Sequence, residues 1–152
     1  MLTGWTPGGV TVDPGPRDLS AQLPASFGLC STAFNGLSLG ASAEPVLGTT
    51  VQWQIGGIAA GTGWGALMRS LTEANPPVDL SAIGMPGCFA HVSGPEATLF
   101  LSPGSSVQIP ESIPNSISLI GATLVGQAVT YNPPLTPLGL VASNGMVLTL
   151  GL

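Results

Sequence analysis

His91 is the only histidine in the chain and would be its natural general base. In that role it would need a nucleophile and an orienting acid close to it, which Ser93 and Asp79 could supply. No spacing singles these residues out, and the hydrolase elbow, zinc-protease, phosphate-loop and EF-hand motifs are absent. We therefore interpret His91 as a structural or exposed residue and expect no enzymatic activity.

Two patterns could hold a ligand, but neither is complete. Asp13 and Asp18 would give a calcium ion two carboxylates, whereas calcium takes six or more oxygen ligands. Residues 61–66 (Gly-Thr-Gly-Trp-Gly-Ala) fit the dinucleotide-binding pattern G-x-G-x-x-A, which needs a long helix after the loop. Pro76 and Pro77 follow too soon for such a helix. We interpret these patterns as a solvated turn and a glycine-rich strand connection, and expect no metal ion or cofactor.

Cys30 and Cys88 are the only cysteines and lack the C-x-x-C spacing of zinc and thioredoxin-like sites. A disulfide between them is the better interpretation, and closing that loop would contribute about 4 kcal/mol in the chain-entropy model. Two separate buried thiols are the alternative. If the disulfide forms, the protein works in an oxidising compartment, so we expect an extracellular or cell-surface location.

The three tryptophans are candidates for contacts with sugars or with other subunits, because sugar-binding modules use exposed aromatic faces. Trp53 lies in the strictly alternating segment 51–55 and is expected in the core. Trp64, which lies between glycines, could be a core residue, a platform for a ligand or a subunit contact. For Trp5 we favour a subunit contact.

Strand signals outnumber helix signals along the chain. Short apolar stretches rich in Val, Ile, Leu and Thr are separated by Gly, Pro, Asn and Ser. This pattern predicts an all-β fold, an antiparallel β-sandwich of jelly-roll or immunoglobulin-like type with about seven to nine strands. The expected strands include residues 51–55, 89–93, 98–101, 106–109, 117–120 and 123–130.

Two segments carry more specific signals. Residues 138–143 and 146–150 flank Asn144-Gly145, a dipeptide that suits the type I′ turn, and so predict a β-hairpin. Residues 66–74 are the only stretch that could be helical, since they lack glycine, proline and crowding by β-branched residues.

Residues 1–25 differ from the rest and are expected to form an extended N-terminal arm before a β-sandwich domain at residues 26–152. Pro/Gly clusters at residues 7–9 and 14–16 bracket a short stretch with Val10 and Val12, which suits an arm better than a central strand. Such a segment could add to a sheet edge of another subunit. Val10 and Val12 are therefore candidate subunit-contact residues.

Charge is nearly missing from the chain. Two cationic and seven acidic side chains make up 6% of the 152 residues, against roughly 25% in an average soluble domain. With two arginines, no lysine and a net charge of -5, no basic patch is expected for nucleic acid or an anionic membrane. No apolar run approaches the length of a membrane-spanning helix. Residues 1–4 lack the features of a secretory signal, so such a signal was either removed or never present.

Several ordered pieces of sequence lie between residue 27 and the C-terminus. The most specific are Pro-Gly-Cys at residues 86–88 and Ser-Asn-Gly at residues 143–145, and further pieces are Cys30 and residues 45–48, 64–65, 79–80, 84–85, 113–115, 121–128 and 138–140. On these pieces the chain resembles a β-sandwich module found, often at the C-terminus, in many uncharacterised secreted bacterial proteins. The resemblance implies an extracytoplasmic all-β module with paired cysteines and no known catalysis.

The lack of surface charge suggests what the protein does. Monomeric proteins guard sheet edges with lysine, inward-pointing charges, proline or bulges, and this chain has no lysine. We expect a homo-oligomer, a structural subunit that assembles into an extracellular filament or surface layer. A carbohydrate-binding or adhesive module with a polysaccharide partner is the first alternative. A phage capsid or tail decoration protein is the second.

Overall fold

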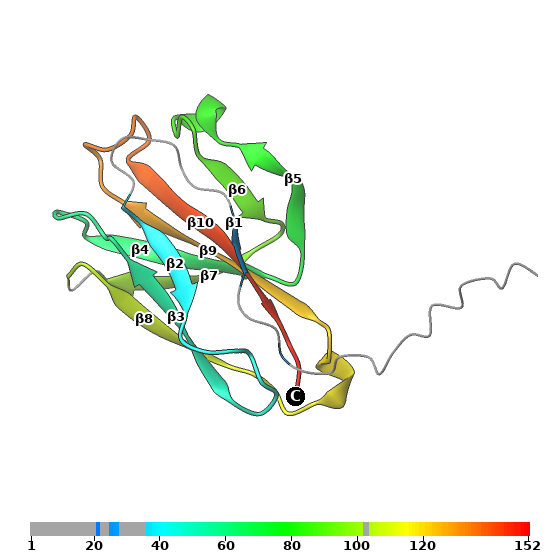
Figure 1. The fold of residues 1–152 in the computed structure, drawn as a ribbon. Helices are drawn as coiled ribbons and strands as arrows, with labels where there is room; N and C mark the ends of the chain where they lie inside the picture. The colour runs from blue at the N-terminus through cyan, green and yellow to red at the C-terminus, as the bar shows by residue number, and fades with distance from the viewer. Residues whose placement is uncertain (1–20, 22–24, 28–35, 102–103) are drawn as a thin grey trace, which may run out of the picture.

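The described residues form ten β-strands and two single-turn 3₁₀ helices, without an α-helix (Figure 1). The computed structural model describes Ala21, the backbone of residues 25–27, and residues 36–101 and 104–152. The strands are β1 (Ala25–Phe27), β2 (Ser38–Ala41), β3 (Thr50–Gly56), β4 (Trp64–Ser70), β5 (Glu73–Asp79), β6 (Phe89–Val92), β7 (Glu96–Leu101), β8 (Val107–Ser112), β9 (Thr123–Tyr131) and β10 (Leu140–Thr149). The 3₁₀ helices are η1 (Ser81–Ile83) and η2 (Ile117–Leu119). The prediction of an all-β fold is confirmed.

These strands pair into three antiparallel sheets. A five-stranded sheet has the order β1-β10-β9-β4-β7, a three-stranded sheet has the order β2-β3-β8, and β5 and β6 form a separate ribbon. The five- and three-stranded sheets enclose a common core as the two layers of an antiparallel β-sandwich, as predicted. The strands expected at residues 51–55, 89–93, 98–101 and 123–130 are confirmed in β3, β6, β7 and β9, and β8 overlaps the one expected at 106–109.

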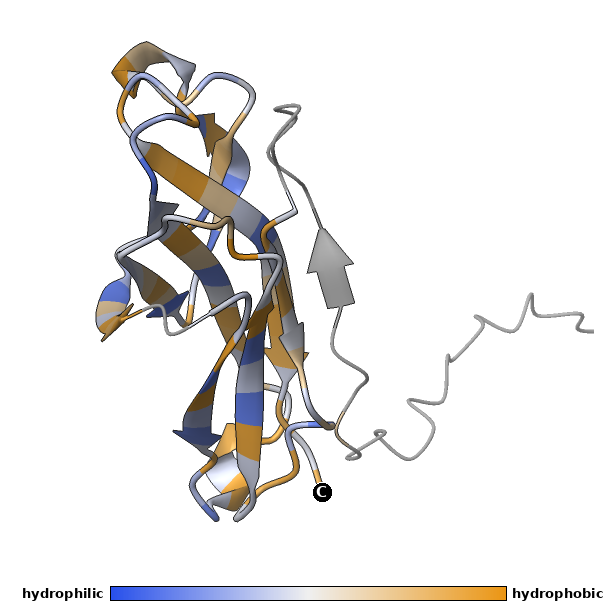
Figure 2. Ribbon diagram, turned by 90° about the vertical axis from the view of Figure 1, so that its left-hand side faces the viewer, coloured by the Kyte–Doolittle hydropathy of each residue, from blue (hydrophilic) through white to orange (hydrophobic). Residues whose placement is uncertain are grey.

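Trp53, at the centre of β3, is the largest side chain of the core between the two sheets. The apolar residues of β3 alternate with its two glutamines and share one buried face, and Trp53 is 0% exposed. Figure 2 shows such alternation as orange and blue bands along the strands. The Trp53 ring lies against Gly126 of β9, where a Cβ atom would come within 2.8 Å of it. Glycine is needed at residue 126 because the two sheets approach so closely.

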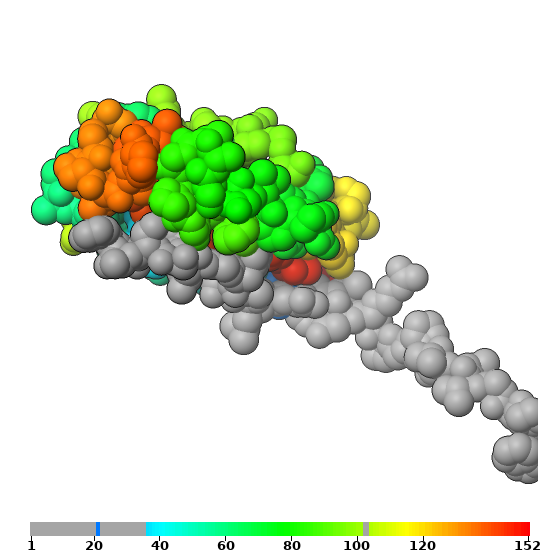
Figure 3. Space-filling model, turned by 90° about the horizontal axis from the view of Figure 1, so that it is seen from above, coloured from blue at the N-terminus to red at the C-terminus, as the bar shows by residue number. Residues whose placement is uncertain are grey.

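The β5–β6 ribbon covers the opposite face of the five-stranded sheet. Along β4, Leu67 points into the sandwich core, whereas its neighbours Ala66 and Met68 point toward the ribbon. Met85, in the connection between β5 and β6, packs on Ala142 of β10. Figure 3 shows the ribbon, in green, as a continuous bulk on the surface. The protein thus has a partial third layer, which the strand pattern did not predict.

The hairpin predicted at Asn144-Gly145 is wrong, because both residues lie inside the single strand β10. The side-chain Oδ1 of Asn144 accepts a hydrogen bond from the N–H of Leu39 (2.9 Å), and its Nδ2 donates to the C=O of Leu39 (3.0 Å). The buried Asn144 amide therefore makes the pair of backbone hydrogen bonds that a neighbouring strand would make with β2. This contact joins the two sheets, which a solvent-exposed turn could not do.

A β-bulge accommodates this arrangement. The register of β10 against β9 shifts between Ala142 and Gly145, so that two residues of β10 face one residue of β9. The backbone N–H of Ala128 falls in the gap and donates to the Oγ of Ser143 (2.9 Å). Within the bulge, the Ser143 hydroxyl also donates to the C=O of Asn144 (2.8 Å), and the Asn144 amide donates to the C=O of Gly145 (3.1 Å).

Two further local predictions are also wrong. Residues 66–74, expected to be helical, contribute to β4 and β5, and β4 is a central strand that pairs with both β7 and β9. Helix propensity separates ordinary residues by no more than about 0.7 kcal/mol each, so pairing on two edges overrides it. Residues 117–120, expected as a strand, begin with η2 instead, and the N–H of Ile120 donates to the C=O of Ile117 (3.2 Å).

Several predicted residues lie outside the described part of the chain. These are Trp5, Val10 and Val12 of the arm, together with Cys30. Cys88 is buried and is not a free cysteine, but its pairing with Cys30 stays a prediction. Within the described ranges, no helix is long and apolar enough to cross a membrane.

Candidate binding surface

An exposed apolar row crosses one end of the five-stranded sheet, on the face that carries the ribbon. On β7, Leu99 and Leu101 are 72% and 79% exposed. Leu101 lies opposite Trp64 of β4, and Trp64 lies opposite Tyr131 of β9. The Trp64 and Tyr131 rings stack, with centroids 5.4 Å apart and planes inclined by 19°. We call these four residues the β7 patch.

Strand alternation explains why the leucines of β7 are exposed. Thr98 and Phe100 point toward the three-stranded sheet, where Thr98 accepts a hydrogen bond from Arg69 and Phe100 lies against Gly65. The residues between and after them must then point to the other face. The β5–β6 ribbon stops short of that position, so an apolar strand face is left open to solvent.

The sheet edges differ in how they are guarded. In the described structure, β1 and β6 are only three and four residues long, β8 contains Pro110, and β5 contains Pro76 and Pro77. On β2, the N–H and C=O of Leu39 are bound by the Asn144 side chain. The edge strand β7 has six residues, no proline and a single charge, Glu96. Short length, proline and covering groups protect edges, so β7 is the least protected of them.

A pocket of about 460 Å³ lies between the ribbon and the five-stranded sheet, next to the β7 patch. Trp64 belongs to both. Most side chains around the pocket are apolar, and the described lining residues are Trp64, Ala66, Met68, Leu80, Met85, Ala90, Val92, Pro95, Gln127, Val129, Leu140 and Ala142. Sequence reasoning missed this pocket, because its walls come from segments that only the ribbon brings together.

Gln127 is the one hydrogen-bonding side chain in this lining, apart from the indole of Trp64. Its Oε1 accepts the backbone N–H of His91 (3.0 Å), and its Nε2 donates to the C=O of Phe89 (2.8 Å) and of Ser143 (3.0 Å). The amide thus fastens β6 to the five-stranded sheet. Both ends of the amide are bound to protein, so little of it is left for a ligand.

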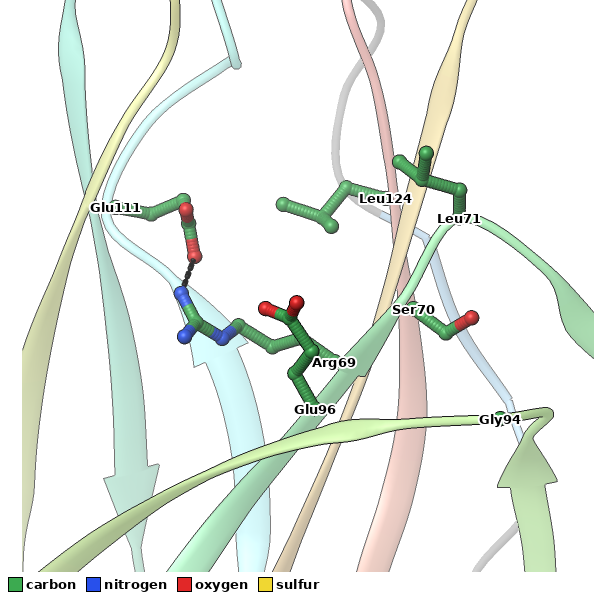
Figure 4. A pocket seen from close by; sticks show the side chains of 7 residues that line it. All are labelled: Arg69, Ser70, Leu71, Gly94, Glu96, Glu111 and Leu124. Atoms are coloured by element: carbon green, nitrogen blue, oxygen red, sulfur yellow. Dashed lines mark hydrogen bonds and ion pairs between the residues drawn. The ribbon is translucent and has the colours of Figure 1, made fainter.

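A second, polar depression of about 400 Å³ surrounds Arg69 (Figure 4). Arg69 forms an ion pair with Glu111 of β8, and the same Glu111 oxygen accepts a hydrogen bond from Nε1 of Trp53 (3.0 Å). Figure 4 shows Glu96 reaching into the depression beside Arg69. Arg69 is the only cationic side chain among the described residues, and its contacts join the two sheets. This arrangement is structural, because the cation is already neutralised.

The structure buries His91, the candidate general base, and leaves Asp79 and Ser93 at the surface. His91 is 5% exposed, and burial lowers the pKa of its ring, although Glu73 acts in the opposite direction. Asp79 and Ser93 are exposed. The Asp79 carboxylate accepts a hydrogen bond from the N–H of Ser81 (2.8 Å), and hydrogen bonds with Ser81 lower its pKa. His91 is thus a buried residue of the ribbon, and its interpretation as a structural residue stays a prediction.

Residues 61–66 lie in the β3–β4 connection and the start of β4, which agrees with their interpretation as a strand connection. Buried Asn132 holds this loop through the C=O of Ala60 (3.1 Å) and the Oγ1 of Thr62 (3.3 Å). Asp13 and Asp18 lie outside the described residues. Among those described, no group of three or more His, Cys, Asp or Glu residues is placed to hold a metal ion.

No protein family profile, curated protein or solved structure matches this chain. The resemblance to a secreted bacterial module therefore stays an expectation from the sequence.

Proposed function

We propose that this protein is a non-enzymatic structural subunit that assembles with copies of itself into a filament or layer. The observation that carries the proposal is the open edge of β7 together with the β7 patch. A mostly apolar edge strand with a single charge, next to exposed leucine and tryptophan side chains, is a site for strand pairing with another chain. The other described edges are short, proline-containing or covered, which leaves β7 as the place where a copy would bind.

The N-terminal arm is the segment that we propose to bind this edge in a neighbouring copy. Val10 and Val12 are two residues apart, so in an extended arm their side chains share one face. Paired with β7, that face would cover Leu99 and Leu101. Because an arm on one surface and an acceptor edge on another form a head-to-tail contact, repetition gives an open polymer.

The extracellular location is part of the proposal and depends on the disulfide between Cys30 and Cys88. Mass spectrometry of the unreduced protein, after alkylation of free thiols, tests it. We expect neither cysteine to be alkylated. Two alkylated thiols would remove the support for an oxidising compartment.

The first test of assembly is electron microscopy and sedimentation velocity of the full chain, with a matched pair of substitutions. Leu99→Lys puts a charge on the edge strand, and we expect it to abolish long assemblies. Leu71→Lys is the control, because Leu71 is also 72% exposed but lies between β4 and β5. A wild-type protein that stays monomeric at high concentration would refute the proposal.

The role of the arm is tested separately. Substitution of Val10 and Val12 by aspartate keeps the chain length but makes the arm unable to cover an apolar strand face. We expect this double variant to remain a folded monomer. If it polymerises like the wild type, the copies are joined through β7 alone and not through the arm.

A further inference from the structure

We infer that the pocket between the β5–β6 ribbon and the five-stranded sheet binds an uncharged, hydrocarbon-rich small molecule. This function is separate from the proposed assembly. The pocket volume, about 460 Å³, falls in the range of pockets that hold small ligands, roughly 300 to 1,000 Å³. Its floor is buried, as Ala66, Met85 and Ala142 show, whereas Trp64 at its rim is 40% exposed. A ligand could therefore enter past Trp64 and lie against the buried floor.

The lining residues determine the class of ligand. None of those described is charged, so a carboxylate, phosphate or ammonium group would be buried there without a partner. The Gln127 amide, which could have recognised a polar ligand, is bound by the backbone of His91, Phe89 and Ser143. A sugar would leave its hydroxyl groups unsatisfied in such a pocket. The pocket therefore fits aliphatic or aromatic hydrocarbon better than the polysaccharide that was considered as a partner of Trp64.

Two methionines give the pocket the means to adapt to such a ligand. Met68 of β4 and Met85 of the β5–β6 connection line it from two sides. The thioether side chain is flexible and polarisable, and it makes favourable contacts with aromatic rings. Because these walls can adjust, we expect selection by polarity more than by shape.

A pair of fluorescent probes tests this inference on the full chain. N-phenyl-1-naphthylamine is uncharged, and 1-anilinonaphthalene-8-sulfonate has the same ring skeleton with a sulfonate added. We expect the uncharged probe to bind at least about 10-fold more tightly, a difference of about 1.4 kcal/mol. Equal affinities, or tighter binding of the sulfonate, would overturn the inference.

Methionine methyl groups report the position of the bound probe. The chain has four methionines, of which Met68 and Met85 line the pocket while Met146 lies in the sandwich core. In ¹³C-methyl NMR, we expect the uncharged probe to shift the signals of Met68 and Met85 and to leave that of Met146 in place. Shifts at neither pocket methionine would show that the probe binds elsewhere.

Filling the pocket provides the matched variants. Ala90→Phe should project a ring into the pocket and lower probe affinity by about 10-fold or more, whereas Ala43→Phe, on the exposed β2–β3 connection, should not. An unchanged Met146 signal verifies that each variant is folded. If Ala90→Phe does not fold, the shifts of Met68 and Met85 in the wild-type protein alone test whether the probe binds in the pocket. Leu99→Lys should abolish assembly and keep probe binding, so failure of this inference and failure of the proposed function are distinguishable.

Discussion

Asn144 shows how one buried amide can replace a length of backbone. Its two hydrogen bonds to Leu39 satisfy an edge of β2 that has no neighbouring strand on that side. An Asn-Gly pair in a short peptide would turn, because glycine and asparagine both tolerate positive φ. In the folded protein, a turn at Asn144 would break its two hydrogen bonds to the backbone of Leu39, and this cost outweighs the local preference for a turn.

Substitution of Asn144 by alanine should therefore be costly. It would leave the buried N–H and C=O of Leu39 without partners, at about 1 to 3 kcal/mol for each group. We expect a loss of about 2 to 4 kcal/mol in the free energy of unfolding, measured by urea denaturation. Asn115→Ala is the control, since Asn115 is exposed, and it should change stability by less than about 0.5 kcal/mol. A small effect at Asn144 would mean that water replaces its amide.

His91 should make stability depend on pH. Burial lowers the pKa of the His91 ring in the folded protein below its ordinary value of 6.5. In mild acid the unfolded chain therefore binds a proton that the folded chain does not. The contribution of neutral His91 to the free energy of unfolding is fully present above pH 6.5, and it is lost as the pH falls from there toward the lowered pKa. We expect urea midpoints to fall between pH 7.5 and pH 5.5. Because the chain has one histidine, His91→Gln should remove this dependence, and an equal fall in the variant would contradict it.

At the scale of elements, the β5–β6 ribbon is the least firmly attached part of the described fold. It pairs with no other strand, and its register is broken between Glu73 and Val78. Gln127 supplies two hydrogen bonds from the sheet to β6, and the packing of Met85 on Ala142 supplies apolar contact. Regions that make few backbone hydrogen bonds to the rest of the protein unfold locally most readily.

Gln127→Leu should loosen this ribbon selectively. The substitution keeps the side chain's approximate size but removes the acceptor for His91 and the donor for Phe89. We expect backbone amides of residues 89–92 to exchange hydrogen faster, while those of β9 and β10 keep their protection. Hydrogen-exchange mass spectrometry measures this, with Gln54→Leu as the control, because Gln54 is an exposed residue of β3. Faster exchange throughout the sandwich would show that Gln127 stabilises the whole fold.

At the scale of the whole molecule, the scarcity of charge limits the contacts that copies could make in the proposed assembly. The described residues contain one cation, Arg69, and it is paired with Glu111 in a partly buried contact between the two sheets. Ion pairs between copies therefore have no cationic partner on this surface. Contacts through the β7 patch would depend on apolar burial and on backbone hydrogen bonds.

Assembly should respond to solvent as apolar association does. Raising NaCl from about 50 to 500 mM should not weaken it, because screening acts on a net charge of -5 that otherwise repels copies. Ammonium sulfate should strengthen it, and cooling should weaken it. Sedimentation velocity at several salt concentrations and temperatures measures these effects. Dissociation at 500 mM NaCl would point to ion pairs, contributed by residues outside the described part.

The sequence was informative where local pattern and tertiary environment agree. The alternation of β3, with Trp53 on its apolar face, predicted a half-buried strand, and the segments of β7 and β9 were recognised from β-branched and apolar runs bounded by glycine or proline. These signals were sufficient for the all-β class and the two-layer sandwich. The low charge is likewise a property of composition alone.

Tertiary structure decided the features that depend on partners distant in sequence. Residues 66–70 became a strand because β7 and β9 supply hydrogen bonds to both of their edges. Asn144 became a link between sheets because Leu39, 105 residues away, lies beside it. The candidate site divides in the same way: Trp64 was named from the sequence, but its apolar neighbours come from β7, β9 and the ribbon. The local sequence pattern cannot specify such contacts, because the free energy of burial and strand pairing depends on both partners, and these lie far apart in the sequence.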